Sequence, residues 1–244
     1  MVLHGADSMR LGPLTAAILD VDGVLLASPH EQAWRDALAG FADPARFTTA
    51  MYQANVAGKP RLDGALAALE ALGVPHADQH VSAYAERKQA RLEELIKGGH
   101  VKAFPDALRF VEAIRRLGWP MAVASSSKNA NAMLQLIRLS DGSTLRDAFS
   151  VNVCGRDLRH GKPDPEIFKL AAEELHVAAH HCFVAEDAPA GIQAARAGGM
   201  AALGVARLHD EAGLQAAHAG LVVATLDDIE ISALADGCLR RRPS

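Results

Sequence analysis

The chain of 244 residues contains few cysteines, and their spacing argues against a disulfide framework. Cys154, Cys182 and Cys238 are an odd number, and no two of them have the spacing of a CxxC motif. The first two lie in apolar runs that are typical of buried strands, where a thiol is an ordinary core residue. Because sparse, unpaired thiols are typical of a reducing compartment, we expect the protein to be cytoplasmic.

The sequence also lacks the features of membrane proteins and of nucleic-acid-binding proteins. No stretch approaches the roughly 18 continuous apolar residues that a membrane span needs. The segment from Met1 to Pro13 has charged and polar residues in place of the apolar region of a signal peptide. The formal net charge of −4, with both signs mixed along the chain, predicts no basic surface. We therefore expect neither a membrane nor a nucleic acid as a partner.

Half of the residues are hydrophobic, which is enough for a sizeable core, and their pattern predicts an α/β fold. Short apolar runs indicate buried strands, and the periodic stretches between them indicate helices. This alternation predicts a doubly wound, Rossmann-like parallel sheet. The predicted strands are Ala16–Leu19, Met121–Ala124, Val151–Cys154, Cys182–Ala185, Ala201–Val205 and Leu221–Ala224. The predicted helices between them are Asp106–Leu117, Asn129–Leu139, Pro165–His176, Gly191–Ala197 and Glu211–Ala219.

The segment between the first two predicted strands has a different pattern, because its periodic stretches are all helical. We predict a small α-helical cap domain at residues 28–99, inserted into an α/β core domain formed by residues 1–27 and 100–244. A cap at the catalytic edge of the sheet would act as a lid, although an inert structural insertion would have the same pattern. The predicted cap helices are Trp34–Phe41, Pro44–Ala54, Leu62–Leu72 and Val81–Ile96.

Two carboxylates follow the first predicted strand, at the edge of the sheet where open α/β folds bind ligands. Asp20 and Asp22 are one residue apart, and two acids so close together are costly unless a cation lies between them. Carboxylate oxygens are suitable ligands for Mg²⁺, whereas the alternative interpretation is an acidic turn. A second acidic pair, Glu186 and Asp187, follows the strand Cys182–Ala185 and favours a metal site.

Two other predicted loops carry groups that bind anions. The hydroxyl of Ser125 and the amine of Lys128 follow the strand Met121–Ala124 at the start of a helix, where free N–H groups bind phosphate. A plain serine N-cap is the alternative. Lys162 lies on a stiff turn before the next helix, although a single lysine is by default a solvated residue. Because these loops and the acidic strand ends converge in a doubly wound sheet, they predict a phosphoryl-transfer site.

Each residue type has a role in the predicted chemistry. The carboxylate of Asp20 can attack phosphorus and form an aspartyl-phosphate. Ser125 and Lys162 can bind the phosphate oxygens, and Asp22 is close enough to act as general acid or base. Mg²⁺ would screen the nucleophile from the negative charge of the phosphate. The carboxylates predicted to hold the metal are Asp20, Asp22, Glu186 and Asp187.

The order of these motifs resembles that of the haloacid dehalogenase superfamily, in its phosphatase and phosphomutase branch. The resemblance extends from about Ala16 to Asp228, and the helical insertion resembles the small cap of that superfamily. It implies a Mg²⁺-dependent enzyme that acts through an aspartyl-phosphate. Dehalogenases lack the second carboxylate, so Asp22 indicates phosphate chemistry. The matching residues are Asp20-x-Asp22-Gly23-Val24, Ser125, Lys162-Pro163 and Glu186-Asp187-x-x-x-Gly191.

Within that superfamily the chain is most similar to the β-phosphoglucomutase family. The run from Ser125 to Asn129 resembles a Ser-x-Ser-Lys-Asn run whose last three residues hold a distal phosphate, and the Gly58–Arg61 loop is similar to a cap loop whose arginine reaches it. His30 and Lys88 resemble a hinge histidine and a cap lysine near the sugar, although solvated residues are the alternative for both and for Arg61. The predicted substrate-binding residues are His30, Trp34, Gly58, Arg61, Lys88, Ser126, Ser127, Lys128 and Asn129.

The cap departs from that family, which leaves the identity of the sugar open. The hinge between Gly23 and Trp34 is two residues shorter, Ala27 replaces a usual aspartate, and the pair Lys59-Pro60 differs from the mutase loop. We predict a phosphotransferase that interconverts a hexose 1-phosphate and 6-phosphate. A phosphatase that hydrolyses a small sugar phosphate with the same machinery is the alternative.

Two other classes of protein share parts of the pattern. A phospho-accepting receiver domain also has an acidic pocket and a lysine, but it is half this length and has no cap. A catalytically silent binder of sugar phosphates would lack the nucleophile or the acid, and both are present. We expect a monomer whose partner is a small phosphorylated sugar.

Overall fold

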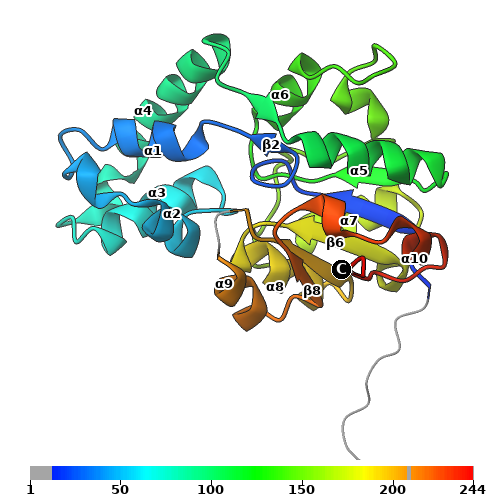
Figure 1. The fold of residues 1–244 in the computed structure, drawn as a ribbon. Coiled ribbons are helices and arrows are strands. Elements are labelled where there is room, and N and C mark those ends of the chain that lie inside the picture. The colour runs from blue at the N-terminus through cyan, green and yellow to red at the C-terminus, as the bar shows by residue number, and fades with distance from the viewer. Residues whose placement is uncertain (1–12, 208–209, 244) are drawn as a thin grey trace, which may run out of the picture.

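Six short apolar runs form one sheet in the computed structural model, which describes residues 13–207 and 210–243. All neighbouring strands in this sheet are parallel, and their order is β5-β4-β1-β6-β7-β8. Each predicted strand is present, so the predicted doubly wound α/β fold is confirmed (Figure 1). The strands are β1 (Ala16–Leu19), β4 (Met121–Val123), β5 (Val151–Asn152), β6 (Cys182–Glu186), β7 (Ala201–Val205) and β8 (Leu221–Val223).

Helices cover both faces of the sheet because strand side chains alternate between the faces. In β1, Ala17 and Leu19 belong to one buried cluster, and Ala16 and Ile18 belong to the other. The helices of the first cluster are α5 (Pro105–Arg116), α6 (Ala130–Leu136) and α10 (Ile231–Ala235). The helices of the second cluster are α7 (Glu166–Glu174), α8 (Pro189–Ala197) and α9 (Glu211–Ala216). Short 3₁₀ turns occur at Leu145–Ala148, Ala179–His181 and Leu226–Asp228.

The direction in which the strands are added to the sheet reverses beside β1. Strands β4 and β5 follow on one side of β1, whereas β6, β7 and β8 follow on the other side. At such a switch point the loops that leave two neighbouring strands run in opposite directions and open a crevice between them. The loops after β1 and β6 carry the predicted acidic residues, so the topology itself brings the two acidic motifs together.

The remaining helices pack around a separate apolar cluster that contains Trp34, Leu69 and Tyr84. Figure 1 shows α1 to α4 grouped on one side, apart from the sheet. The predicted helical insertion is therefore present, while its domain boundaries at residues 28 and 99 stay a prediction. The elements are α1 (His30–Ala37), a 3₁₀ turn (Pro44–Arg46), α2 (Thr49–Asn55), α3 (Arg61–Ala71) and α4 (Ala77–Lys97).

Several element boundaries differ from the predictions. The first cap helix begins at His30, four residues before the predicted start. The helix predicted from Pro44 to Ala54 is divided in two, because the Thr48 hydroxyl accepts a hydrogen bond from the Met51 N–H and starts a new helix. Helix α6 ends at Leu136, three residues early, because Ile137 adopts an extended backbone conformation.

Strands β2 (Leu26–Ala27) and β3 (Lys102–Ala103) form an antiparallel pair that the sequence analysis missed. A strand of two residues is too short to produce an alternating pattern. Both chain connections between the sheet and the helical cap run through this pair, which therefore lies at the base of the cap.

The described residues include no helix with the length and apolar character needed to cross a membrane. The prediction that Met1 to Pro13 contains no signal peptide concerns residues that, except for Pro13, lie outside the description.

Candidate active site

The two acidic motifs meet where β1 and β6 end. Leu19 and Ala185 are partners in the parallel ladder, so Asp20 and Glu186 leave the sheet side by side. One carboxylate oxygen from each of Asp20, Glu186 and Asp187 lies within 4.8 Å of the others. Asp20 is 5% exposed and Glu186 is fully buried. The predicted convergence of two strand ends is therefore a feature of the structure.

Lys162 connects this carboxylate group to the loop before α7. Its Nζ donates hydrogen bonds to Asp20 Oδ1 at 2.6 Å and to Glu186 Oε1 at 2.5 Å, and the side chain is 1% exposed. Burial alone would lower the pKa of Lys162, but the two carboxylates outweigh it and raise the pKa above the ordinary value. Lys162 is therefore a charged ammonium fixed between two buried acids.

A single ammonium does not neutralise three neighbouring carboxyls. Burial raises the pKa of Asp20 to about 8, because the stabilising effect of Lys162 is opposed by Glu186 and Asp22. Burial and the charges of Glu186 and Asp20 also raise the pKa of Asp187 well above its ordinary value. When its three carboxyls are ionised, the cluster has an excess of negative charge, and it offers only oxygen ligands. These residues fit a Mg²⁺ ion, which prefers oxygen ligands and supplies the missing positive charge.

Two glycines are required for the acids to lie so close together. Gly23 has a φ of +76°, and a Cβ at this position would overlap the carboxylate of Asp187. A Cβ on Gly191 would overlap the carboxylate of Glu186. Both glycines belong to the sequence motifs, and the structure gives the physical reason for them.

The side chain of Asp22 is directed toward the cap. The Ser28 hydroxyl donates a hydrogen bond to Asp22 Oδ1, and His30 Nε2 lies 3.2 Å from Asp22 Oδ2. Burial raises the pKa of this carboxyl to about 6, against the lowering effects of Ser28 and Lys88. Among the described residues, the metal-sized carboxylate group contains Asp20, Glu186 and Asp187 but not the Asp22 side chain. A role for that side chain as a metal ligand stays a prediction.

His30 and Lys88 form a buried pair beside Asp22. Lys88 Nζ lies 2.8 Å from His30 Nδ1, and it also lies over the ring of Trp34 at 4.8 Å. Burial, together with the charge of Lys88, lowers the pKa of His30 well below its ordinary value. Burial lowers the pKa of Lys88 to about 7, although Asp22 opposes this effect. The predicted cap residues therefore meet next to the predicted acid–base residue.

The serine-rich loop after β4 lies between the carboxylates and the cap. Ser125 is 3% exposed, and its hydroxyl accepts a hydrogen bond from the Ser127 N–H at 3.2 Å. The Ser126 hydroxyl donates to the carbonyl of Gly58 at 3.1 Å, and Ser127 Oγ lies 3.2 Å from His30 Nε2. This loop thereby connects the core to both the cap loop and the hinge.

Two residues of the predicted phosphate subsite already have protein partners. The Lys128 ammonium forms an exposed ion pair with Asp157 at 2.9 Å. The amide of Asn129 exchanges hydrogen bonds with the amide of Gln89 in α4, at 3.2 and 3.3 Å. Asp157 and Gln89 were missed by the sequence analysis, because an isolated polar residue in a loop or on a helix surface has no distinctive pattern.

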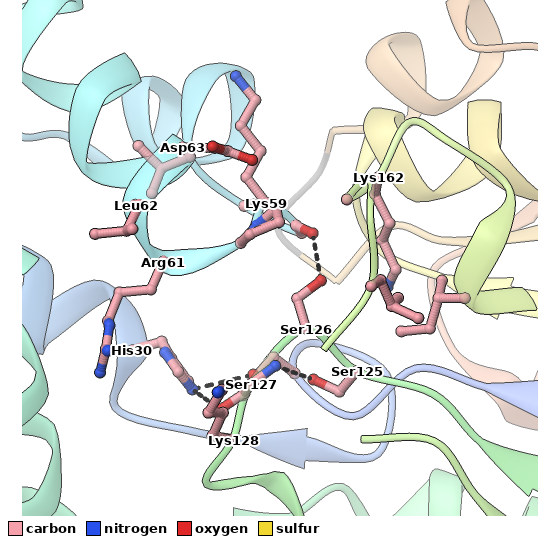
Figure 2. A pocket seen from close by; sticks show the side chains of 18 of the residues that line it. His30, Lys59, Arg61, Leu62, Asp63, Ser125, Ser126, Ser127, Lys128 and Lys162 are labelled. Carbon is pink, nitrogen blue, oxygen red and sulfur yellow. Dashed lines mark hydrogen bonds and ion pairs between the residues drawn. The ribbon is translucent and has the colours of Figure 1, made fainter. Parts of the chain in front are cut away.

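A cavity of about 490 Å³ joins these groups. It is lined by every predicted catalytic and substrate-binding residue and by Asp187, whereas Glu186 is not part of the lining. Figure 2 shows Arg61 and His30 on one side of the cavity and Lys162 on the opposite side. Other lining residues that the sequence did not single out include Tyr52, Val56, Leu62, Asp63, Arg159 and His160.

Comparison with known proteins gives a consistent result. The family described as haloacid dehalogenase-like hydrolase matches residues 14–199. The chain is 32% identical over 214 residues to a β-phosphoglucomutase of Mycobacterium tuberculosis, covering 76% of this chain and 78% of that protein. It is 34% identical over 190 residues to the fructose-1-phosphate phosphatase YqaB of Escherichia coli, covering 77% of this chain and 94% of that protein.

A similar fold is found among solved structures. A β-phosphoglucomutase from a Pyrococcus species has a TM-score of 0.70 and 29% sequence identity, and the match covers 91% of this chain and 99% of that one. The relatives therefore include both mutases and phosphatases.

The raised carboxyl pKa values predict how the protein responds to Mg²⁺ at different pH. A carboxyl whose pKa is higher in the folded protein than in the unfolded chain destabilises the fold as pH rises through that interval. Mg²⁺ removes this penalty and binds only the ionised carboxylates. We expect the increase in Tm on adding Mg²⁺ to be larger at about pH 8 than at about pH 5. Differential scanning calorimetry measures both values.

Asp187→Asn should reduce that increase at the higher pH, because it removes one charged ligand. Asp157→Asn is the matched control, since this carboxylate is exposed and pairs with Lys128 outside the cluster. An increase in Tm that is equal at both pH values would contradict the proposed charge balance.

Proposed function

Because the chain belongs to the haloacid dehalogenase-like hydrolases and is therefore an enzyme that acts on phosphate esters, we propose that it is a hexose-phosphate mutase. In this proposal it interconverts a hexose 1-phosphate and 6-phosphate through an aspartyl-phosphate on Asp20. The proposal rests on the charge distribution in the cavity, which has an acidic end for phosphoryl transfer and a cationic end for a second phosphate.

Phosphoryl transfer takes place at the acidic end. The carboxylate of Asp20 forms a bond to phosphorus while the bond from phosphorus to the sugar oxygen breaks. The hydroxyl of Ser125 and the ammonium of Lys162 bind the phosphate oxygens as charge shifts during transfer. When bound by Asp20, Glu186 and Asp187, Mg²⁺ would supply the positive charge that lets an anionic phosphate approach a carboxylate.

In this proposal Asp22 is the general acid and base of both half-reactions. A pKa of about 6 suits a group that gives and takes a proton near neutral pH. The Asp22 carboxylate takes a proton from the free hydroxyl of the sugar phosphate as that hydroxyl accepts the phosphoryl group from Asp20, which gives a bisphosphate. When Asp20 then attacks the other phosphate of this bisphosphate, protonated Asp22 gives its proton to the departing sugar oxygen. The contacts from Ser28 and His30 hold the carboxyl beside the cavity.

The cationic end is the observation that supports a mutase. Arg61 lines the cavity at the start of α3, and within the described residues it makes no hydrogen bond or ion pair. Burial is the main cause of the lowered pKa of Lys88, and the positive charge of Arg61 adds to it while Asp22 opposes it, so two basic side chains lie near each other. A second phosphate satisfies both of them, and a planar guanidinium can bind two phosphate oxygens at once. A mutase requires such a subsite, because its intermediate is a bisphosphate.

A sugar phosphatase is the second candidate, and the identity to the fructose-1-phosphate phosphatase YqaB favours it. The two reactions use the same nucleophile and acid. They differ in whether water or a sugar hydroxyl takes the phosphoryl group from Asp20, and so in whether a second phosphate must be held. A β-phosphoglucomutase and a phosphatase are about equally similar to this chain, so the decision rests on the product formed.

Asp20→Asn should lower turnover by orders of magnitude, because the amide cannot attack phosphorus and weakens the metal site. Steady-state release of phosphate from acetyl phosphate measures this loss. Asp36→Asn is the control, since Asp36 pairs with Arg91 outside the cavity. If Asp20→Asn keeps more than about a tenth of wild-type activity, Asp20 is not the nucleophile.

Arg61→Ala should depress the conversion of β-glucose 1-phosphate, primed with glucose 1,6-bisphosphate, about ten- to a hundred-fold. Loss of a charge-assisted contact costs about 1.5–3 kcal/mol, which corresponds to this factor. Hydrolysis of acetyl phosphate, which has no second phosphate, should change little. Arg91→Ala is the control, because Arg91 lies on the same cap but pairs with Asp36 and Glu94 outside the cavity.

Equal losses on both substrates would remove the distal-phosphate role of Arg61. Release of phosphate from β-glucose 1-phosphate by the wild type, with no glucose 6-phosphate formed, would contradict the mutase and establish the phosphatase.

A further inference from the structure

Arg207 follows β7 and contacts the turn after β1 that contains Gly23 and Val24. Its side chain is 12% exposed. Its Nε donates a hydrogen bond to the carbonyl of Gly23 at 2.8 Å, and one terminal nitrogen donates to the carbonyl of Val24 at 2.9 Å. The other terminal nitrogen forms a 2.9 Å ion pair with Asp106. A planar guanidinium can make these three contacts together, whereas a lysine ammonium lacks this fixed fork.

The same guanidinium contacts both chain connections to the cap. Gly23 and Val24 lie on the chain segment just before β2, separated from it by Leu25, and through β2 the chain leaves the core. Phe104 immediately follows β3, through which the chain returns, and its ring lies 3.8 Å from the Arg207 guanidinium carbon. The Phe104 N–H also donates to the Leu25 carbonyl at 3.0 Å, so the two connections are joined directly.

Asp106 fixes the position of the guanidinium from the other side. Its Oδ2 accepts hydrogen bonds from Thr225 Oγ1 at 2.7 Å and from the Leu226 N–H at 2.8 Å, in addition to Arg207. Although burial alone would raise the pKa of Asp106, these hydrogen bonds hold it below the ordinary value. The carboxylate is therefore charged and immobile, and it ties Arg207 to the end of the sheet.

The turn that Arg207 holds lies against the catalytic carboxylates. Gly23 directly follows Asp22, and it packs so closely against the Asp187 side chain that a Cβ would not fit. A displacement of this turn would move Asp22, and a displacement of 1 Å in a catalytic group is enough to reduce a rate about a hundredfold. Arg207 does not line the cavity, so it acts only through the turn.

We propose that Arg207 is a positioning residue that sets the orientation of Asp22 and secures the bases of both cap connections. The part that concerns Asp22 rests on the proposed function, in which Asp22 gives a proton to the departing oxygen. The part that concerns the two connections stands on the contacts alone.

The kinetic test compares two substrates whose leaving groups differ in their need for a proton. In the conversion of β-glucose 1-phosphate the departing sugar oxygen needs protonation, whereas the oxygen that leaves p-nitrophenyl phosphate does not. Because kcat/KM reports the steps up to departure of the leaving group, Arg207→Met should lower it about ten- to a hundred-fold for β-glucose 1-phosphate. It should stay within about threefold of wild type for p-nitrophenyl phosphate. Arg207→Lys should show the same pattern with a smaller loss.

Two comparisons assign the effect to Asp22. Asp22→Asn should show the same selective loss, and adding Arg207→Met to it should cause little further loss. Arg109→Met is the matched control, because Arg109 forms a two-bond ion pair with Asp227 on the exposed surface nearby.

If Asp22→Asn shows the selective loss but the Arg207 variants lower kcat/KM equally for both substrates, the positioning role is overturned. If Asp22→Asn itself shows no selectivity, the proposed function fails instead.

Hydrogen–deuterium exchange tests the connections without reference to activity. Arg207→Lys and Arg207→Met should accelerate exchange in peptides covering residues 21–28 and 101–105, and leave strand β1 unchanged. Arg109→Met should leave both peptides unchanged. Unaltered exchange in the two peptides in a folded Arg207 variant would overturn the anchoring of the connections.

Discussion

The structure of the site depends on Lys162, the buried ammonium that lies between Asp20 and Glu186. Removing charged groups from water is costly, and a pair survives in the interior only with close geometry and further hydrogen bonds. Glu186 has these, because its second oxygen accepts the N–H groups of Asp187 and Ala188 at 2.9 and 3.1 Å. Burial and mutual repulsion raise the pKa values of Asp20 and Asp187, so a divalent cation would favour the ionised form of both carboxyls by offsetting their charge. Breaking the lysine contact would therefore alter the fold at this edge and the chemistry together.

The topology of the sheet places this charge cluster opposite the cap. Strand order reverses beside β1, so the loops after β1 and β6 border one crevice, and the serine loop after β4 closes its side. The Ser126 hydroxyl donates a hydrogen bond to the Gly58 carbonyl, which joins the core to the cap loop. Arg61 at the start of α3 and the pair of His30 and Lys88 then face the carboxylates across the cavity. This arrangement is the basis of the proposed mutase activity, in which the intermediate carries two phosphates.

The strands of the sheet could be predicted because strands that are buried on both faces have continuous apolar runs. The convergence of four motifs could be predicted because the carboxyl ends of parallel strands lie at one edge of the sheet. The direction of Asp22 was not predictable, since it depends on a hydroxyl six residues away at Ser28 and on a histidine in the cap. Arg207 was missed for the same reason. Its partners Gly23, Phe104 and Asp106 are distant in sequence, and an isolated arginine after a strand has no pattern of its own. The start of α1 at His30 was misplaced because a histidine and a glutamate in its first turn carry no apolar period.

The central claim is that Asp20 carries the phosphoryl group during turnover. The most direct measurement is to mix the Mg²⁺-loaded enzyme with acetyl phosphate, quench it in acid within the first turnover, reduce the acyl phosphate with borohydride, and map the peptides by mass spectrometry. We expect the reduced residue, homoserine, at position 20 in the wild type, and none there in Asp20→Asn. Homoserine at Asp22 or Asp187 in place of Asp20, or a complete turnover with no reducible intermediate at any time point, would contradict the account.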